Sequence, residues 1–121
     1  MKPVYAGRII NQEKKMKSIL YINRKDAEKV MKVKGFCLIH HIRIEKEPED
    51  PELPEDAEIM RFAGMSNAEV GEMITRLRAM GIVVPLKCVE TETNRDWPLS
   101  RLYKELSEEH EYMKNQNRPK D

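Results

Sequence analysis

The chain has 121 residues, of which 40% are hydrophobic and 36% are charged, and its formal net charge is +1. This length fits one domain with one core, and no apolar run approaches the roughly 20 residues that a membrane-spanning helix needs. The N-terminal stretch lacks the apolar region of a signal peptide, and Cys37 and Cys88 lie far apart with no C-x-x-C spacing. We therefore expect a single cytoplasmic domain, residues 1–121, with reduced thiols.

Charge is distributed unevenly along the chain. Residues 1–44 hold eleven Lys/Arg against three Asp/Glu, whereas residues 45–56 hold seven acids and one lysine. Such segregation is compatible with a nucleic-acid or acidic-partner surface. The interpretation that we favour is that the acidic segment lies over the basic half and screens it, since surface charge is most often only solvated.

The first elements are short. Residues 1–17 carry no clear pattern, and we treat them as an N-terminal extension. The run SILYI over residues 18–22 is rich in β-prone side chains, which predicts a strand. Asn23 then offers an N-cap for a helix over residues 24–33, whose apolar residues fall on one face.

A second strand is predicted after this helix. Gly35 can adopt the left-handed conformation that ends a helix. Residues 36–44, FCLIHHIRI, place apolar side chains at alternate positions, as in a strand with one mainly apolar face. Residues 45–56, EKEPEDPELPED, combine three prolines with seven acids, so we expect an acidic, Pro-rich loop there.

The second half repeats the order strand, helix, strand. Residues 57–63 predict a strand. Ser66 and Glu69 have the spacing of a capping box at the start of a helix over residues 67–80, which carries one apolar stripe. Residues 82–89 predict another strand.

The last helix is the most strongly patterned segment. It is predicted to begin near Pro98 and to end near Lys114, with apolar residues at spacings of three and four over two heptads. We expect this amphipathic face to cover the sheet, and pairing with a second copy is the alternative. Residues 115–121 are expected to form a disordered tail.

The order of elements is therefore β-α-β-β-α-β followed by a helix. The two β-α-β units are weakly similar, and each has a glycine that is expected to end its helix, Gly35 and Gly81. This order favours an α+β fold with a ferredoxin-like split βαβ sheet and both helices on one face, plus the C-terminal amphipathic helix. The alternative is a small open sheet with helices on both faces. The third helix decides between them, and the sequence does not place it.

The loop TETNRDWP, between the last strand and the last helix, is the candidate binding site. Anions often bind in α/β proteins where a loop leaves a strand and enters a helix. The candidate ligand-binding residues are polar, charged or aromatic: Thr91, Thr93, Asn94, Arg95, Asp96 and Trp97. The interpretation that we favour is structural, because Asn and Thr side chains commonly tie a loop to its own backbone and an indole pins it to the core.

The same region resembles a known family. The chain has a T-x-T-N-x-x-W loop from Thr91 to Trp97, followed by a helix with the sequence ELSEEHEYM. Together with the strand–helix–Gly–strand region from Ile59 to Val89, this arrangement is similar to an uncharacterised bacterial family of small α/β proteins, classed as a domain of unknown function. The resemblance covers roughly the second half of the chain. It implies no activity and therefore no catalytic residue.

A metal site has weak support. Cys37, His40 and His41 form a C-x-x-H-H run, but on a strand only Cys37 and His41 share a face, which is too few ligands for a closed zinc site. No nucleophile elbow and no Gly-rich phosphate loop is present. We expect no catalytic residue, no metal and no cofactor.

The acids of the last helix lead to a prediction about contacts. Glu108, Glu109 and Glu111 lie near its C-terminal end, where the helix dipole disfavours negative charge. We therefore expect at least one of them to contact basic side chains from residues 24–34 or from a neighbouring chain.

The sequence favours a cytoplasmic, non-enzymatic binding or protein-interaction module. One alternative is a small-ligand or anion binder, or an enzyme, that uses the loop from Thr91 to Asp96. Another is a nucleic-acid binder that uses the basic residues 14–34, which the low aromatic content of 6% disfavours. No membrane partner is expected. A weak homodimer through the C-terminal helix is the partner interaction that the pattern suggests.

Overall fold

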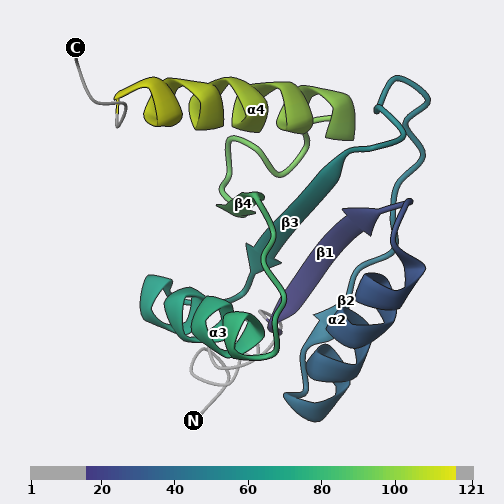
Figure 1. Ribbon diagram of the computed structural model, residues 1–121, viewed down its shortest axis with the longest axis vertical. Helices are drawn as coiled ribbons and strands as arrows, with labels where there is room; N and C mark the ends of the chain where they lie inside the picture. The colour runs from purple at the N-terminus through teal and green to yellow at the C-terminus, as the bar shows by residue number, and fades with distance from the viewer. Residues whose placement is uncertain (1–15, 117–121) are drawn as a thin grey trace, which may run out of the picture.

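The computed structural model describes residues 16–116. Most of the predicted N-terminal extension and of the predicted tail lies outside the described residues. Seven elements follow one another in the described range (Figure 1): β1 (Ser18–Asn23), α2 (Ala27–Ile39), β2 (Arg43–Ile44), β3 (Glu58–Ala63), α3 (Asn67–Ala79), β4 (Leu86–Val89) and α4 (Leu99–Gln116). None of the helices in this range is long and apolar enough to cross a membrane.

The first helix begins later than predicted. Asn23 does not cap it, because its Oδ1 accepts hydrogen bonds from the N–H groups of Lys25 and Asp26 at 3.1 and 3.0 Å and so forms the turn after β1. Asp26 is the N-cap, and its carboxylate accepts from the N–H of Lys29 at 3.0 Å. The helix therefore starts at Ala27.

The predicted strand over residues 36–44 is wrong in its first half. α2 continues to Ile39 and buries three side chains spaced three and four residues apart: Val33, Phe36 and Cys37. The apolar residues of this segment fit a helical period as well as an alternating one. The helix forms because it buries these side chains against the sheet. His41, with a φ of 58°, follows the helix end, and only the short β2 remains to pair with β1.

The second β-α-β unit follows the predicted order. The hydroxyl of Ser66 accepts from the N–H of Glu69 at 3.2 Å, and the Glu69 carboxylate accepts from the N–H of Ser66 at 2.9 Å. The predicted capping box is therefore confirmed. The predicted strand over residues 82–89 is shorter than expected, because Ile82 and Val84 pack into the core from a loop and only β4 pairs with β3.

From the first strand to the end of the helix, the two units correspond residue by residue at a constant offset of 40, whereas the edge strands β2 (Arg43–Ile44) and β4 (Leu86–Val89) do not. Ile42 and Ile82 each follow a helix and donate their N–H to a carbonyl of its last turn, at 2.8 and 2.9 Å. The residues before them, His41 and Gly81, both have positive φ. The equivalent of Gly81 is therefore His41, and not Gly35, which lies inside α2.

The strand order is β2-β1-β3-β4, with β1 and β3 antiparallel at the centre and each edge strand parallel to its neighbour. The α+β class is confirmed, but the split βαβ order is wrong, since a split unit would have a strand of the other unit between its own two strands. Both orders place β1 and β3 at the centre and bury the same side chains. The hydrophobic pattern therefore could not distinguish them.

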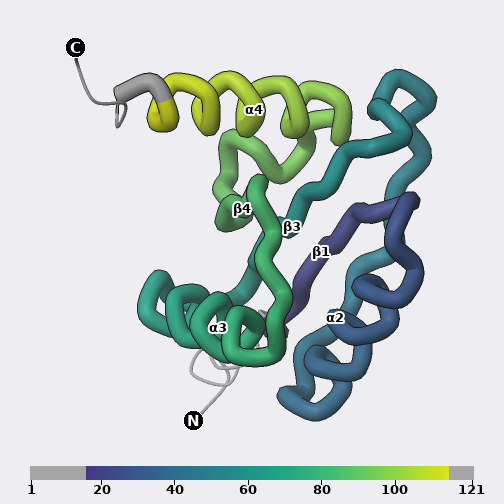
Figure 2. The backbone as a smooth tube through the Cα atoms, viewed as in Figure 1, coloured from purple at the N-terminus to yellow at the C-terminus, as the bar shows by residue number. Residues whose placement is uncertain are grey.

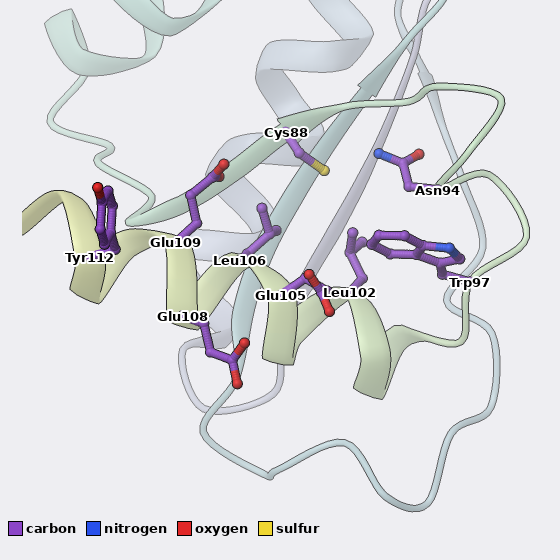
Figure 3. Close-up of a pocket in the computed structure, with 9 residues that line it drawn as sticks. All are labelled: Cys88, Asn94, Trp97, Leu102, Glu105, Leu106, Glu108, Glu109 and Tyr112. Atoms are coloured by element: carbon purple, nitrogen blue, oxygen red, sulfur yellow. The ribbon is translucent and has the colours of Figure 1, made fainter.

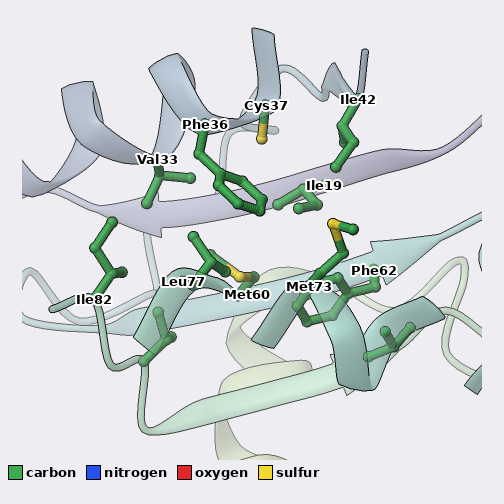
Figure 4. Close-up of a cluster of buried hydrophobic side chains, with 12 residues drawn as sticks. Ile19, Val33, Phe36, Cys37, Ile42, Met60, Phe62, Met73, Leu77 and Ile82 are labelled. Carbon is green, nitrogen blue, oxygen red and sulfur yellow. The ribbon is translucent and has the colours of Figure 1, made fainter. Parts of the chain in front are cut away.

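Helices cover both faces of the sheet (Figures 1 and 2). α2 and α3 share one face, where their buried side chains meet Ile19, Met60 and Phe62 of the central strands (Figure 4). α4 lies on the other face, where its residues Leu99 and Leu102 pack in a second cluster with Leu20, Ile22 and Ile59. The open sheet with helices on both faces is thus the arrangement found.

The acidic segment joins β2 to β3 and is fixed at several points. Leu53 is buried in the cluster under α4. Arg24, in the turn after β1, pairs with Glu47 at 2.8 Å and with Glu55 at 3.9 Å. The segment therefore contacts the basic half of the chain, as the charge distribution predicts.

Candidate functional site: a groove along α4

The loop between β4 and α4 is held by its own hydrogen bonds. Asn94 is 9% exposed, and its Oδ1 accepts from the N–H of Thr91 at 2.9 Å while its own N–H donates to Oγ1 of Thr91 at 3.0 Å. Its Nδ2 donates to the carbonyl of Val89 at 3.1 Å, and its carbonyl accepts from the N–H of Trp97 at 3.2 Å. The Asn94 side chain therefore organises the loop.

The bond to Val89 also occupies a backbone group at the edge of the sheet. Successive residues of a strand direct their backbone polar groups to opposite sides. The N–H of Glu90 donates to Phe62 of β3 at 2.7 Å, so the carbonyl of Val89 faces away from β3. The Asn94 side chain donates a hydrogen bond to this carbonyl. Pro85, which directly precedes the first residue of β4, has no N–H to donate. One outward-facing group of the edge strand is therefore already bonded within the chain.

The six candidate ligand-binding residues do not converge on one point. Asn94 and Trp97 line a groove along α4. Arg95 instead lines a separate polar pocket, and its Nε lies 3.4 Å from a carboxylate oxygen of Glu90. Three of the six line neither cavity: Thr91, Thr93 and Asp96.

The groove lies between α4, β4 and the loop, and has a volume of about 470 Å³ (Figure 3). Its apolar part comes from Leu102 and Leu106 of α4 and Cys88 of β4. Trp97 and Tyr112 stand at opposite ends of the groove in this view. The guanidinium of Arg101 lies 4.1 Å from the centroid of the Trp97 ring, so the indole already stacks with a cation.

Three carboxylates complete the lining, and all belong to exposed residues of α4: Glu105, Glu108 and Glu109. None of them forms an ion pair with another residue of the described range. Residues 24–34 lie around α2 on the opposite face of the sheet. The predicted contact between these basic residues and Glu108, Glu109 or Glu111 of the same chain is therefore wrong.

The thiol in the groove is not activated. Burial raises the pKa of Cys88 from 9.0 to about 11, and Glu109 adds to this effect while Arg61 opposes it. A thiol with such a pKa is almost wholly protonated at neutral pH, and the thiolate is the reactive form.

A second pocket, which is polar, was not predicted from the sequence. Its volume is about 560 Å³, and its polar lining comprises Ser18, Arg43, Glu45, Glu90 and Arg95. Next to it, Nη2 of the buried Arg61 lies 3.4 Å from Glu45 and 3.9 Å from Glu90, and its Nε has no hydrogen-bond partner. Arg61 alternates with Met60 and Phe62 along β3, which predicts a solvent-facing side chain. Only the tertiary structure buries it.

Another polar cluster ties α2 to the sheet. The Tyr21 hydroxyl donates to Oε2 of Glu58 at 2.6 Å, and Nζ of Lys29 lies 2.6 Å from the same oxygen. Lys29 also donates to the carbonyl of Val83 at 2.8 Å. Burial is the main cause that raises the pKa of Tyr21, so its hydroxyl stays protonated. These hydrogen bonds and the ion pair join four segments of the chain: β1, α2, β3 and the loop before β4.

The C-x-x-H-H run does not form a ligand cluster. Cys37 is buried within α2, and His40 follows the last residue of the helix with its ring 4.4 Å from that of Phe36. His41 is exposed. Among residues 16–116 no group of three or more His, Cys, Asp or Glu side chains is arranged to hold a metal ion.

Comparison with known proteins found a family match within the second half of the chain. Residues 58–113 match a family described only as a domain of unknown function (DUF3783). The matched region runs from the start of β3 into α4 and includes the loop and the groove. It supports the resemblance to an uncharacterised family. No curated protein and no solved structure matches the chain.

Proposed function

We propose that the protein is a non-enzymatic interaction module, and that the groove along α4 binds a positively charged segment of a partner protein. The observation that carries this proposal is the lining of the groove. Glu105, Glu108 and Glu109 surround an apolar strip, and none has a cationic partner in the described part of the chain.

The lining suits lysine or arginine side chains with apolar neighbours. An exposed ion pair contributes only about 0.2–1 kcal/mol, and a cation over an aromatic face about 0.5–2 kcal/mol. Several such contacts together with burial of Leu106 and Tyr112 are therefore needed for stable binding. The groove presents these features side by side. Arg101 stacked on Trp97 is an example, within the chain, of the contact that a partner would make.

The hydrogen bonds of the loop favour this function over the alternatives. Asn94 and Thr91 use their side chains on the loop itself, which leaves little capacity for an anionic ligand or a substrate. The basic residues that would hold nucleic acid are partly neutralised, because Arg24 pairs with Glu47 and Lys29 with Glu58. Fewer free charges mean weaker electrostatic binding to phosphates.

Fluorescence anisotropy with labelled peptides tests the proposal. We expect a peptide that mixes lysine, arginine and leucine to bind, and a matched peptide with glutamate in place of the basic residues not to bind. Binding should weaken as the salt concentration rises, because these charges are exposed to solvent.

Variants of the groove provide the control. The triple variant Glu105→Gln, Glu108→Gln, Glu109→Gln should lose most of the peptide affinity. Glu111→Gln removes a charge from the same helix outside the groove lining and should bind almost as the unmodified protein does. Equal loss in both variants would show a general charge effect and would contradict the proposed groove.

A further inference from the structure

An exposed apolar strip runs along α2, on the side opposite its buried face. Met31, Leu38 and Ile39 are 67%, 78% and 72% exposed, and Leu38 and Ile39 are the most exposed large hydrophobic side chains in the described range. Gly35 lies among them, and a Cβ built there would meet no atom within 4 Å. Exposed apolar side chains that gather on one face of a helix commonly mark an interaction site. We call these four residues the α2 strip.

The charges around the α2 strip are mainly positive. Lys25, Lys32 and Lys34 are exposed near it, with Glu28 as the one acid on that side. None of the three lysines forms an ion pair with another residue between 16 and 116. The α2 strip therefore has the character that the groove along α4 requires of a partner, namely apolar side chains flanked by positive charge.

The two surfaces cannot meet within one molecule. α2 packs on one face of the sheet and α4 on the other, with the sheet between them (Figures 1 and 2). They can meet only between two copies of the chain. Near the groove, the exposed Tyr112 and Met113 add apolar surface to α4. Both sides of such a contact would thus bury apolar surface and pair opposite charges.

We propose that the α2 strip of one copy docks into the groove along α4 of a second copy. This inference rests on the proposed function of the groove and names its occupant. The contact is heterologous, because it joins two different surfaces. After one contact forms, each pair still has one free strip and one free groove, so assembly continues beyond a dimer unless a ring closes.

Mixing two defective variants tests this geometry in the full chain. The groove variant is Glu105→Gln, Glu108→Gln, Glu109→Gln, and the strip variant is Lys32→Glu, Leu38→Gln. All five positions are exposed, so both variants should fold, which circular dichroism verifies. Sedimentation velocity should show concentration-dependent assembly of the unmodified protein and monomers for each variant alone. An equimolar mixture should give a one-to-one complex and nothing larger, because only one productive contact remains.

The alternatives give different results. An unmodified protein that stays monomeric at every concentration would overturn the inference. So would assembly of the strip variant alone, or a mixture that remains monomeric. If the groove still binds basic peptide while the protein stays monomeric, only the identity of the occupant is wrong and the proposed function stands. If Glu111→Gln abolishes assembly as the groove variant does, the contact does not use the groove.

Discussion

The carboxylate of Asp50 accepts a hydrogen bond of 2.7 Å from the backbone N–H of Ser100. Ser100 lies in the first turn of α4, where N–H groups have no partner within the helix. A residue of the acidic segment thus provides the cap for a helix that begins far away in the sequence. Leu53 of the same segment is buried beneath α4. The acidic segment therefore helps to place the groove.

Loss of this cap should destabilise the protein. We expect Asp50→Ala to lower the Tm, because the N–H groups of Ser100 and Glu52 both lose their partner. Asp50→Asn keeps an acceptor oxygen at the position and should lower the Tm less. Glu49→Ala, next to it in the same segment but with no hydrogen bond in the structure's described range, is the control. Thermal unfolding followed by circular dichroism measures all three, and equal effects would contradict a specific cap.

The same bond predicts a dependence on pH. The hydrogen bond from Ser100 lowers the pKa of Asp50 below its ordinary value of 3.8. A carboxyl whose pKa is lower in the folded state stabilises the fold above its unfolded pKa, and this contribution is lost as the pH falls through the folded pKa. Between pH 5 and pH 2 the stability of Asp50→Asn should therefore fall less steeply than that of the unmodified protein. Chemical denaturation at several pH values measures the difference, and parallel curves would contradict it.

The loop should depend on Asn94 far more than on Thr93. Asn94→Ala leaves the Val89 carbonyl and the Thr91 N–H without their partners and should lower the free energy of unfolding by about 1–3 kcal/mol. Thr93 is exposed, and Thr93→Ala should change the free energy of unfolding by less than about 0.5 kcal/mol. Urea denaturation compares the two. Similar effects would mean that the loop is not organised by Asn94.

Gly81 and His41 follow the two helices at equivalent positions, and substitutions there test this equivalence. Gly81 has a φ of 82°, and Gly81→Ala should cost about 1–2 kcal/mol because a side chain disfavours this conformation. His41, its equivalent with a φ of 58°, already bears that cost, so His41→Gly should leave the stability unchanged or raise it by up to about 1 kcal/mol. Gly71→Ala, inside α3, should stabilise by about 0.5–1 kcal/mol. A clear loss of stability in His41→Gly, measured by urea denaturation, would contradict the equivalence of His41 and Gly81.

Both cysteines should react slowly in the folded protein. Burial raises the pKa of each thiol from 9.0 to about 11, so at pH 8 the thiolate fraction is about a hundredfold lower than for a free cysteine. Cys37 is fully buried and Cys88 half-buried. Reaction with an aromatic disulfide reagent should show two slow phases, and Cys88→Ser should remove the faster one. A fast reaction phase in the folded protein would contradict the burial of the two thiols.

Local patterns predicted most of the elements correctly. The capping box of Ser66 and Glu69 and the apolar period of α4 both depend on residues close in sequence, so the sequence alone suffices to identify them. Gly35 and the run FCLIHHIRI led to a wrong prediction, because glycine is tolerated inside an exposed helix and the run fits both a helical and an alternating period. At the candidate site, the polar residues of the loop were identified but not their partners, since Asn94 bonds to Val89 only when the loop folds back over the strand.

By itself, the sequence determined which residues are apolar at which period, and hence that strands and helices alternate in two similar units followed by an amphipathic helix. Only the tertiary structure decided that β2 lies beside β1, that α4 covers the face opposite α2, and that Glu105, Glu108 and Glu109 of α4 have no cation of residues 16–116 beside them. The reason is physical. The period of the apolar residues shows which face of each element is buried. Which elements lie next to each other depends on contacts between residues far apart in the chain, and several arrangements bury nearly the same surface.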